Sequence, residues 1–552
     1  MKALQLILAL LLLTLSCTTG GERLAGSKGG SETTNGVMAR IVYPDGTPAA
    51  ESAVRLRKAD YVSDISALPK KSAVYADIRT DSQGQFMIDS LDTGSYCIEI
   101  ISTEKSSTQS GAVLLKFTIA NNRDTVDLGT DTLRQFASIV GQVESGSANL
   151  YVQIRGLERI TKAAPDGTFS FDDLPAGTHS VRVVDAGSDI VREVQNVQTA
   201  PGETFSVKIS DIHINTSNAG ISSFGVIENF PLLVRLESPA FDFSTAHAAG
   251  NDIRFSKPNG KSLSYEIEQW DPISGNAAVW VLVDSIWGNR NNQYIVMSWG
   301  TPEASSLSNG AAVFNTAFGF SGVWHFNEDP SAGNNAIKNR TANEFHGTAS
   351  SSMTSANVVS GVAGGALMFD GENDNIQAGL LDLNGNYTLS CWIKIEQQQS
   401  IHTNWRFIIR ERAYTLWYDN DDRRWGGFRA EHYAGADADE RRWVGIYQDK
   451  DDTNSRPDHS AVFDVWSHIA ATWDGDKIRL FINGEVVDST LHLPHPPTAS
   501  DRQQLLFGGR SEEHFKGIMD EVRIERVARP AEWIRLSYET QRIGGTVVRY
   551  ER

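Results

Sequence analysis

Short runs of alternating apolar and polar residues, separated by glycine-containing turns, recur along this chain. The clearest stretch is 466–484, in which two alternating runs are separated by Asp474-Gly475 and followed by Asn483-Gly484. Alternation with a period of two places apolar side chains on one face of a β-strand, and Asp-Gly and Asn-Gly are preferred hairpin turns. The 47 Gly and 17 Pro are spread along the chain at such turns. The sequence therefore predicts an all-β fold.

Length and composition limit the domain number and the class of partner. A chain of 552 residues is too long for one hydrophobic core and predicts roughly three to five domains. Charged residues make up 21% and hydrophobic residues 40%, which is typical of globular protein. The formal net charge is −18 and no long basic run occurs, so we expect no nucleic-acid partner.

The N-terminus has the pattern of an export signal. Lys2 precedes an apolar run over 3–13, which is shorter than the roughly 20 residues that span a bilayer, and Ser16-Cys17 follows. This pattern resembles the lipobox of bacterial lipoproteins, although Thr14 stands where leucine is usual. The resemblance implies a lipoprotein signal over 1–17, lipidation of Cys17, and a lipid anchor at an outer membrane or cell surface. The alternative is an ordinary secretory signal with an incidental cysteine.

After a Gly/Ser/Thr-rich segment over 18–35, expected to be a flexible tether, the sequence repeats itself. The same residue types recur at the same spacing in both copies: Gly84, Phe86, Leu91 and Gly94, then Gly167, Phe169, Leu174 and Gly177. Each copy predicts a turn, a strand and a second tight turn. The pattern resembles the carboxypeptidase regulatory-like domain, a small Greek-key β-sandwich, over 36–133 and, as a shorter copy, 134–212. Such domains usually serve as spacers without catalytic residues.

Residues 213–319 form a third predicted sandwich. The alternating strand that contains Tyr265 and Trp270 resembles an uncharacterised bacterial β-sandwich family that often precedes laminin-G-like modules. Glu266, Glu268 and Asp271 lie in this strand. They are either an acidic site or, as we prefer, part of a solvated face, because Glu266 and Glu268 share the face opposite Tyr265.

The remaining sequence resembles the laminin-G-like, concanavalin A-like jelly roll over 320–541, and 542–552 are expected to form a C-terminal tail. The resemblance rests on the 466–484 hairpins, Leu506-Phe-Gly508-Gly509 and Phe515-Lys-Gly517-Ile-Met-Asp520-Glu521. It implies two face-to-face sheets with one concave surface that commonly binds carbohydrate or protein. Since the fold also hosts glycosidases, it does not determine function alone. Asn339 stands where aspartate is common.

A stretch over 402–459 is rich in aromatic and charged residues, which suits the stacking and hydrogen bonding of sugar rings. The candidate ligand-binding residues are Trp405, Arg406, Trp425, Arg429 and Trp443. The alternative is that most of these tryptophans belong to the core, as we expect for Trp392 and Trp417.

Catalytic and metal signals are weak. The nearest match to a glucanase carboxylate motif is Glu372-Asn-Asp374, which lacks the third acid and is interpreted as a turn. No cofactor is expected to be required. If a structural calcium ion is bound, Asp520 is the first candidate ligand. Cys97 and Cys391 are expected to be buried thiols rather than a disulfide.

The sequence thus predicts an envelope-anchored, non-catalytic lipoprotein that binds polysaccharide or glycan, or mediates adhesion, through its C-terminal domain. The alternatives are a glycoside hydrolase or lyase with an unrecognised site, and a scaffold whose partners are envelope or surface proteins.

Overall fold

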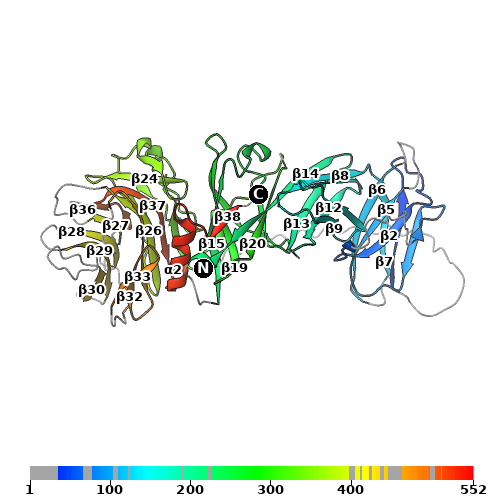
Figure 1. The fold of residues 1–552 in the computed structure, drawn as a ribbon. Coiled ribbons are helices and arrows are strands. Elements are labelled where there is room, and N and C mark those ends of the chain that lie inside the picture. Colours follow the sequence, from blue (N-terminus) through cyan, green and yellow to red (C-terminus); the bar gives the residue numbers. More distant parts are fainter. Residues whose placement is uncertain are drawn as a thin grey trace, which may run out of the picture.

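The computed structural model describes residues 35–65, 78–102, 110–121, 125–188, 190–219, 225–301, 303–396, 405–410, 413–421, 425–434, 440–445, 463–490, 493, 495–497, 504–510 and 513–550. Cys17 and the predicted export signal lie outside these ranges. The described part is all-β and multidomain, and its four units lie in a row in chain order (Figure 1).

The first two units are seven-stranded sandwiches with the same topology. The first sandwich has β1 (Gly36–Val42), β2 (Ala53–Lys58), β3 (Ile78–Arg79), β4 (Gln85–Asp89), β5 (Gly94–Ile101), β6 (Ala112–Ile119) and β7 (Thr125–Thr132). The second sandwich has β8 (Ala137–Val143), β9 (Leu150–Ile154), β10 (Arg159–Lys162), β11 (Thr168–Leu174), β12 (Gly177–Asp185), β13 (Ile190–Thr199) and β14 (Thr204–Ile214). Sheets β4-β1-β7 and β3-β2-β5-β6 of the first correspond to β11-β8-β14 and β10-β9-β12-β13 of the second. The sequence repeat therefore folds as a structural repeat.

The turns of the repeat explain two of its glycines. Gly84 and Gly167 have φ values of +74° and +81°. A Cβ atom there would lie 2.2 Å and 2.1 Å from a carbonyl oxygen of the facing strand, so a side chain would force that strand away. Phe86 and Phe169, two residues later, are buried in the two cores.

The middle unit shares a sheet with the second sandwich. It has β15 (Val226–Glu237), β16 (Arg254–Ser256), β17 (Ser262–Leu263), β18 (Tyr265–Asp271), β19 (Asn276–Trp287), β20 (Gln293–Trp299) and the short helix α1 (Gly310–Val313). One layer is β15-β19-β18. In the other, β14 pairs with β20, so β11-β8-β14-β20-β16-β17 is one continuous sheet. The expected boundary at 212–213 lies inside β14.

The chain returns to the middle unit at its end. Strand β38 (Val548–Tyr550) pairs with the end of β14, and the C-terminus lies beside β14 and β20 in Figure 1. The Tyr550 ring packs against Phe241 and Trp299, with centroids 5.7 and 6.4 Å apart. Where the sequence predicts a tail over 542–552, the structure has a sheet strand that contributes an aromatic ring to the middle unit.

The C-terminal sandwich has two large sheets. The back sheet is β23 (Val358–Ser360), β24 (Gly365–Asp370), β37 (Lys516–Glu525), β26 (Tyr387–Ile395), β31 (Trp466–Trp473), β32 (Ile478–Ile482) and β33 (Glu485–Ser489), with β21 (Phe320–Trp324) beside β37. The front sheet is β22 (Thr348–Ala349), β25 (Ile376–Gln377), β34 (Leu506–Phe507), β27 (Trp405–Arg410), β28 (Tyr414–Asp421), β29 (Trp425–Ala434) and β30 (Glu440–Gly445). The hairpin β35 (Gly509–Arg510) and β36 (Glu513–His514) and the helix α2 (Ala531–Gln541) complete it.

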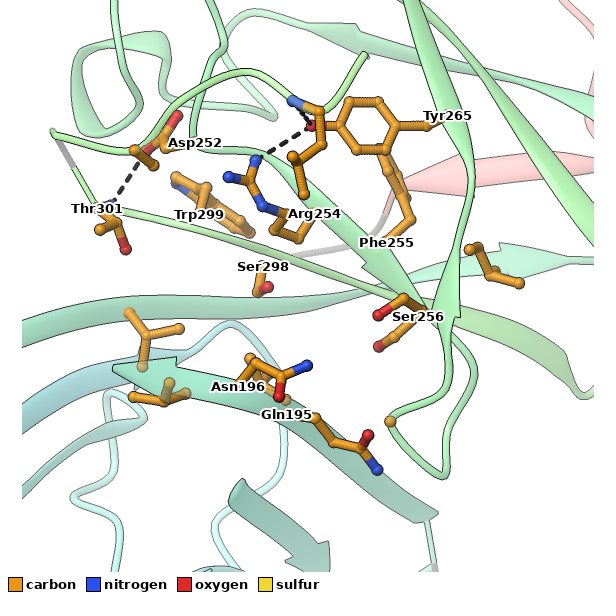
Figure 2. Close-up of a pocket in the computed structure, with 18 of the residues that line it drawn as sticks. Gln195, Asn196, Asp252, Arg254, Phe255, Ser256, Tyr265, Ser298, Trp299 and Thr301 are labelled. Carbon is orange, nitrogen blue, oxygen red and sulfur yellow. Dashed lines mark hydrogen bonds between the residues drawn. The ribbon is translucent and has the colours of Figure 1, made fainter. Parts of the chain in front are cut away.

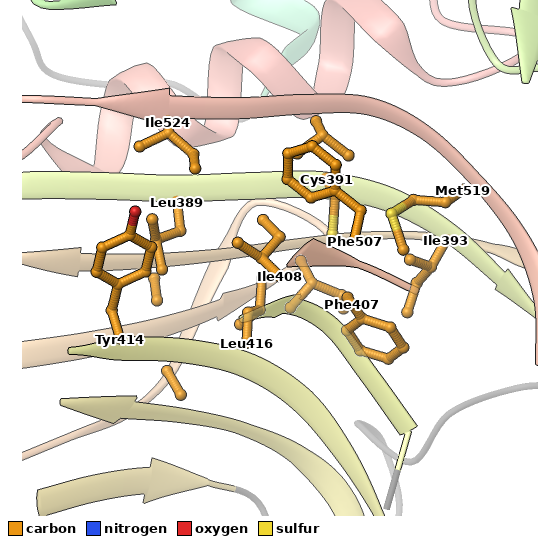
Figure 3. Close-up of a cluster of buried hydrophobic side chains, with 14 of the residues drawn as sticks. Leu389, Cys391, Ile393, Phe407, Ile408, Tyr414, Leu416, Phe507, Met519 and Ile524 are labelled. Atoms are coloured by element: carbon orange, nitrogen blue, oxygen red, sulfur yellow. The ribbon is translucent and has the colours of Figure 1, made fainter. Parts of the chain in front are cut away.

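The two sheets enclose one apolar core. Figure 3 shows Leu389, Cys391 and Ile393 of the back sheet facing Phe407 and Ile408 of the front sheet. The hairpins expected over 466–484 are present as β31, β32 and β33. Cys391 and Cys97 are buried free thiols, as the sequence predicts.

A second apolar cluster joins the middle unit to the back sheet and α2. Phe230 of β15 lies against Trp533 of α2, with ring centroids 4.9 Å apart. Trp392 is buried on the outer side of the back sheet, where it stacks on Tyr538 of α2 and donates from Nε1 to Gln541 Oε1 at 2.7 Å. Trp392 is therefore covered by α2 rather than packed between the two sheets. Within the described ranges, neither α2 nor any other helix has the length and apolar character needed to cross a membrane.

Candidate functional site

The outer face of the front sheet carries a row of aromatic and charged side chains. In β28, Leu416 and Tyr418 belong to the core. Because successive strand residues point to opposite faces, Trp417 points away from the core. Arg406 of β27 and Arg429 of β29 are its register partners on the two flanking strands. Three residues from three strands are therefore placed side by side.

Trp417 lies between these two arginines. The Cζ atoms of Arg406 and Arg429 are 5.3 and 5.1 Å from the centre of its ring, within the range of cation–π contact. The Trp417 side chain is buried, and its Nε1 donor has no acceptor in the described part of the chain. A buried donor without an acceptor costs about 1–3 kcal/mol.

Carboxylates hold both guanidinium groups in place. Arg406 donates to both oxygens of Glu513, at 2.5 and 3.0 Å, and lies 3.9 Å from Glu431. Arg429 pairs with Asp419. We name this set the front-sheet row, and its members are Arg406, Trp417, Asp419, Arg429, Glu431 and Glu513.

Of the predicted ligand-binding residues, Arg406 and Arg429 lie in this row, whereas Trp405 does not. Trp405 is 2% exposed, belongs to the core and stacks on Tyr418 with centroids 5.7 Å apart. Since Trp405 and Arg406 are adjacent in one strand, they point to opposite faces, and assigning both to a binding face was wrong.

Trp417, in contrast, was expected in the core. It is buried, at 3% exposure, but it does not belong to the apolar cluster between the two sheets. The signal was present in the sequence, because Trp417 is out of phase with Tyr414, Leu416 and Tyr418, which all lie in the core. The Trp417 side chain is buried on the outer face of the front sheet.

Trp425 and Trp443 are placed by their backbone alone. Trp425 begins β29 opposite Asp421, and Trp443 lies in β30 opposite Glu431 of the front-sheet row. Their side chains lie outside the described part of the structure, so a role in binding stays a prediction for both.

A second cluster of charged groups is buried between the middle unit and the back sheet. His325 of the segment after β21 contacts Glu521 of β37 through Nδ1, and its Nε2 lies 3.4 Å from Glu266. Glu268 Oε2 lies 3.8 Å from His325 Nδ1 and accepts from Trp280 Nε1 at 2.7 Å. The interpretation of Glu266 and Glu268 as a solvated face was therefore wrong, because the C-terminal sandwich covers that face.

Burial and charge set the protonation of this cluster. Burial raises the pKa of Glu268 well above its usual range. Burial opposes protonation of His325, but the charges of Glu521, Glu268 and Glu266 outweigh it and raise its pKa. His325 and Arg523 in turn lower the pKa of Glu521. Glu268, His325 and Glu521 each place a ligand-type atom within 4.8 Å of the others, a spacing at which such groups can hold a metal ion. Here His325 and Arg523 already balance the charge of Glu521.

Two other acidic candidates serve turns. Asp520 Oδ2 accepts from the backbone N–H groups of Val362 and Ala363 at 2.6 and 3.1 Å. Asp374 accepts from the Ser352 hydroxyl at 2.6 Å, and the neighbouring Asp370 caps the turn that follows β24. The 372–374 segment is thus a turn, and a calcium ion at Asp520 stays a prediction.

Comparison with known proteins identifies two segments of the chain. The model of the concanavalin A-like lectin/glucanases superfamily matches residues 370–535, inside the C-terminal sandwich. The model of a domain of unknown function, DUF2341, matches residues 249–328, which overlap the segment expected to belong to an uncharacterised β-sandwich family. A search of curated proteins gives no match.

Solved structures resemble part of the chain at low similarity. The binding domain of Paraclostridial mosquitocidal protein 1 is 13% identical, with a TM-score of 0.32, over 40% of this chain and 52% of that one. The botulinum neurotoxin serotype D binding domain is 17% identical, with a TM-score of 0.30, over 40% and 52%. Domain 4 of AbnA, a GH43 extracellular arabinanase from Geobacillus stearothermophilus solved with arabinotriose, is 18% identical, with a TM-score of 0.29, over 41% and 98%.

This chain therefore spans about half the length of the first two structures, and TM-scores of this size support no conclusion about function. The family match is the firmer result, and it agrees with the two-sheet architecture described above. The described part of the protein is multidomain and all-β, and its C-terminal sandwich is a concanavalin A-like domain.

Proposed function

We propose that this protein binds a polysaccharide or glycan chain at the front-sheet row, without transforming it, and that a lipid on Cys17 holds it at a bacterial envelope. The observation that carries the binding proposal is the alternation of guanidinium and carboxylate groups around Trp417 on the outer face of the front sheet.

The row supports this function by its chemistry. Guanidinium groups donate and carboxylates accept hydrogen bonds in fixed directions, which suits hydroxyl groups spaced along a sugar chain. The Arg406 and Glu513 side chains are 12% and 30% exposed, so their outer atoms reach solvent. Their mutual ion pair lowers the conformational entropy that a ligand would otherwise have to remove.

Trp417 positions the two arginines of the row and does not form its outer surface. Its ring separates the two arginines, and its Nε1 is a donor that a hydroxyl reaching between them would satisfy. Within the row, Asp419, Glu431 and Glu513 each have an arginine within 4.0 Å, so they serve as ion-pair partners rather than as a free pair of acids.

The test is binding of the full chain to a panel of neutral and acidic polysaccharides. We expect Arg429→Gln and Arg406→Gln to weaken binding about tenfold each, the loss of a charge-assisted hydrogen bond. Arg134→Gln is the matched control, because Arg134 forms a surface ion pair with Asp131 in the distant first sandwich. Wild-type chain that binds no member of the panel would refute the proposal, and release of reducing ends would refute its non-catalytic part.

A further inference from the structure

A cavity of about 590 Å³ lies between the second sandwich and the middle unit. Figure 2 shows Gln195 and Asn196 of β13 on one side, Arg254 and Trp299 of the middle unit on the other, and Ser298 between them. This volume is within the range of small-ligand sites. The two walls belong to units that share one sheet, in which β14 pairs with β20.

A second hollow of about 380 Å³ lies between the first and second sandwiches, and it shares Gln195 and Asn196 with the first. The two hollows therefore adjoin at these residues. Lys116 of β6 lines the second hollow. Together they form a path along three consecutive units, which we name the stem groove.

Asn196 stands at the centre of the stem groove in an unusual conformation. Its φ is +60°, and it lies in a β-bulge where two residues of β13 oppose one of β12. The bulge exposes Gln195 and Asn196 next to each other, and Asn196 makes no side-chain hydrogen bond within the described part of the chain. Exposed amides in such a groove offer both donors and acceptors to hydroxyl groups.

The edge of β13 does not favour an added peptide strand. The Val191 carbonyl accepts from the Tyr294 hydroxyl at 2.9 Å, and the Glu193 carbonyl lies 3.4 Å from the Ser256 hydroxyl. The bulge breaks the hydrogen-bonding register beyond them. A ligand recognised through side-chain amides and hydroxyls fits better than one recognised through its backbone.

Two cations line the stem groove without a carboxylate partner among the described residues. Arg254 donates to the carbonyls of Asn251, Ile253 and Ser305 and to the Tyr265 hydroxyl, at 2.7–3.1 Å, and these acceptors are all neutral. Lys116 Nζ donates to one backbone carbonyl at 2.6 Å. The carboxylate nearest in sequence to Arg254, that of Asp252, accepts three backbone N–H groups instead.

Ser298 adds a polar group inside the first hollow. It is 6% exposed, it lines the cavity, and its hydroxyl makes no hydrogen bond in the part of the chain that the structure describes. The hydroxyl of a residue that is more than nine-tenths buried and lines a cavity is a ready partner for a bound ligand.

From these features we propose that the stem groove binds a polysaccharide that carries carboxylate groups, such as a chain of uronic acids. Arg254 and Lys116 attract the carboxylates, while Asn196, Gln195 and Ser298 meet the sugar hydroxyls. This site is separate from the front-sheet row. The chain then binds one glycan at the front-sheet row and an acidic glycan in the stem groove.

The test measures binding of the full chain to polygalacturonate, alginate and hyaluronate at pH 7 in low salt. We expect at least one to bind, and Arg254→Gln and Lys116→Gln each to weaken that binding about tenfold. Lys162→Gln is the control, because Lys162 lies over Tyr151 in the second sandwich and does not line the stem groove. Raising the salt concentration should weaken binding, since exposed charges are screened.

Further arms separate this site from the front-sheet row. Arg429→Gln should leave uronate binding unchanged, and methyl-esterified polygalacturonate, which lacks the charge, should bind at least tenfold more weakly than the free acid. Failure of all three polysaccharides to bind overturns the proposal. So does uronate binding that Arg254→Gln and Lys116→Gln leave intact, or that only Arg429→Gln removes.

Discussion

The carboxylate of Glu521 contacts the Nδ1 atom of His325, although 196 residues separate the two in the sequence. Glu521 has a φ of +51°, at a register shift between β26 and β37. It also accepts from Arg523 at 2.6 Å. This left-handed residue holds its carboxylate in the contact between the back sheet and the middle unit, where the charges of His325 and Arg523 compensate its burial.

Glu268 and Glu521 should respond differently to loss of charge. Burial raises the pKa of Glu268 and so favours its uncharged carboxyl, and Glu268→Gln should therefore cost about 1 kcal/mol or less. Glu521→Gln leaves His325 and Arg523 without their counter-charge in a buried site and should cost about 3–5 kcal/mol. Urea unfolding followed by tryptophan fluorescence measures both, and equal losses would contradict the assigned protonation states.

The pH dependence of stability should carry the signature of buried neutral histidine. Burial lowers the pKa of His468 to about 3, while the unfolded chain retains a value of about 6.5. Between these values the unfolded chain binds more protons, so stability falls as the pH is lowered, by up to about 1.4 kcal/mol per pH unit. Unfolding temperatures at pH 6.5 and 5 should therefore differ less in His468→Leu than in wild type. An unchanged difference would show that His468 does not titrate as described.

The second sandwich should depend on the phenylalanine of its repeat. Phe169→Ala removes a buried ring and should reduce the opening free energy of β8 and β11 by about 3–5 kcal/mol. Met87 follows Phe86, the counterpart of Phe169 in the first sandwich, and is 51% exposed. Met87→Ala should therefore change the stability of the first sandwich by less than about 0.5 kcal/mol. Amide hydrogen exchange measures both effects. Similar values for the two variants would mean that the repeat does not place Phe169 in a core.

Removal of residues 547–552 should destabilise the middle unit rather than the distant first sandwich. The deletion removes β38, its pairing with β14 and the packing of Tyr550 on Phe241. We expect faster amide exchange in β14 and β20 and unchanged exchange in β1 and β5. Tyr550→Ala, which keeps the backbone pairing, should give a smaller effect of the same kind. Normal protection of β14 in the deletion variant would contradict a structural role for β38.

Replacement of the expected lipidation site tests the anchor. If Cys17 carries the lipid, Cys17→Ala should move the protein from the membrane fraction to the soluble fraction of the cell, because acyl chains bind membranes at about 0.8 kcal/mol per buried methylene group. Cys391→Ala is the control, because its thiol is buried in the core and cannot carry a lipid. Cys17→Ala protein that stays in the membrane fraction would contradict lipidation of Cys17.

The elements that follow from local pattern were predictable, and those that depend on contact between units were not. Gly84 and Gly167 predict their turns, because only glycine fits a positive φ next to a carbonyl of the facing strand. Glu268 has the alternation of an exposed residue, and nothing near it in the sequence indicates that the C-terminal sandwich covers it. In β28 Trp417 was expected in the core because it lies in a strong strand pattern, but the strand phase places it on the face opposite Leu416 and Tyr418.

Strand β38 sets an order of events during synthesis. It pairs with Ile212–Ile214 of β14, beyond the part of that strand that pairs with β8, and it is synthesised after the C-terminal sandwich. The two N-terminal sandwiches can close their cores early, whereas the middle unit is complete only after residues 548–550 have been synthesised. A ribosome that stops before residue 548 therefore releases a protein in which the edge of β14 at Ile212–Ile214 is open. Such edges are sites of aggregation and of recognition by chaperones.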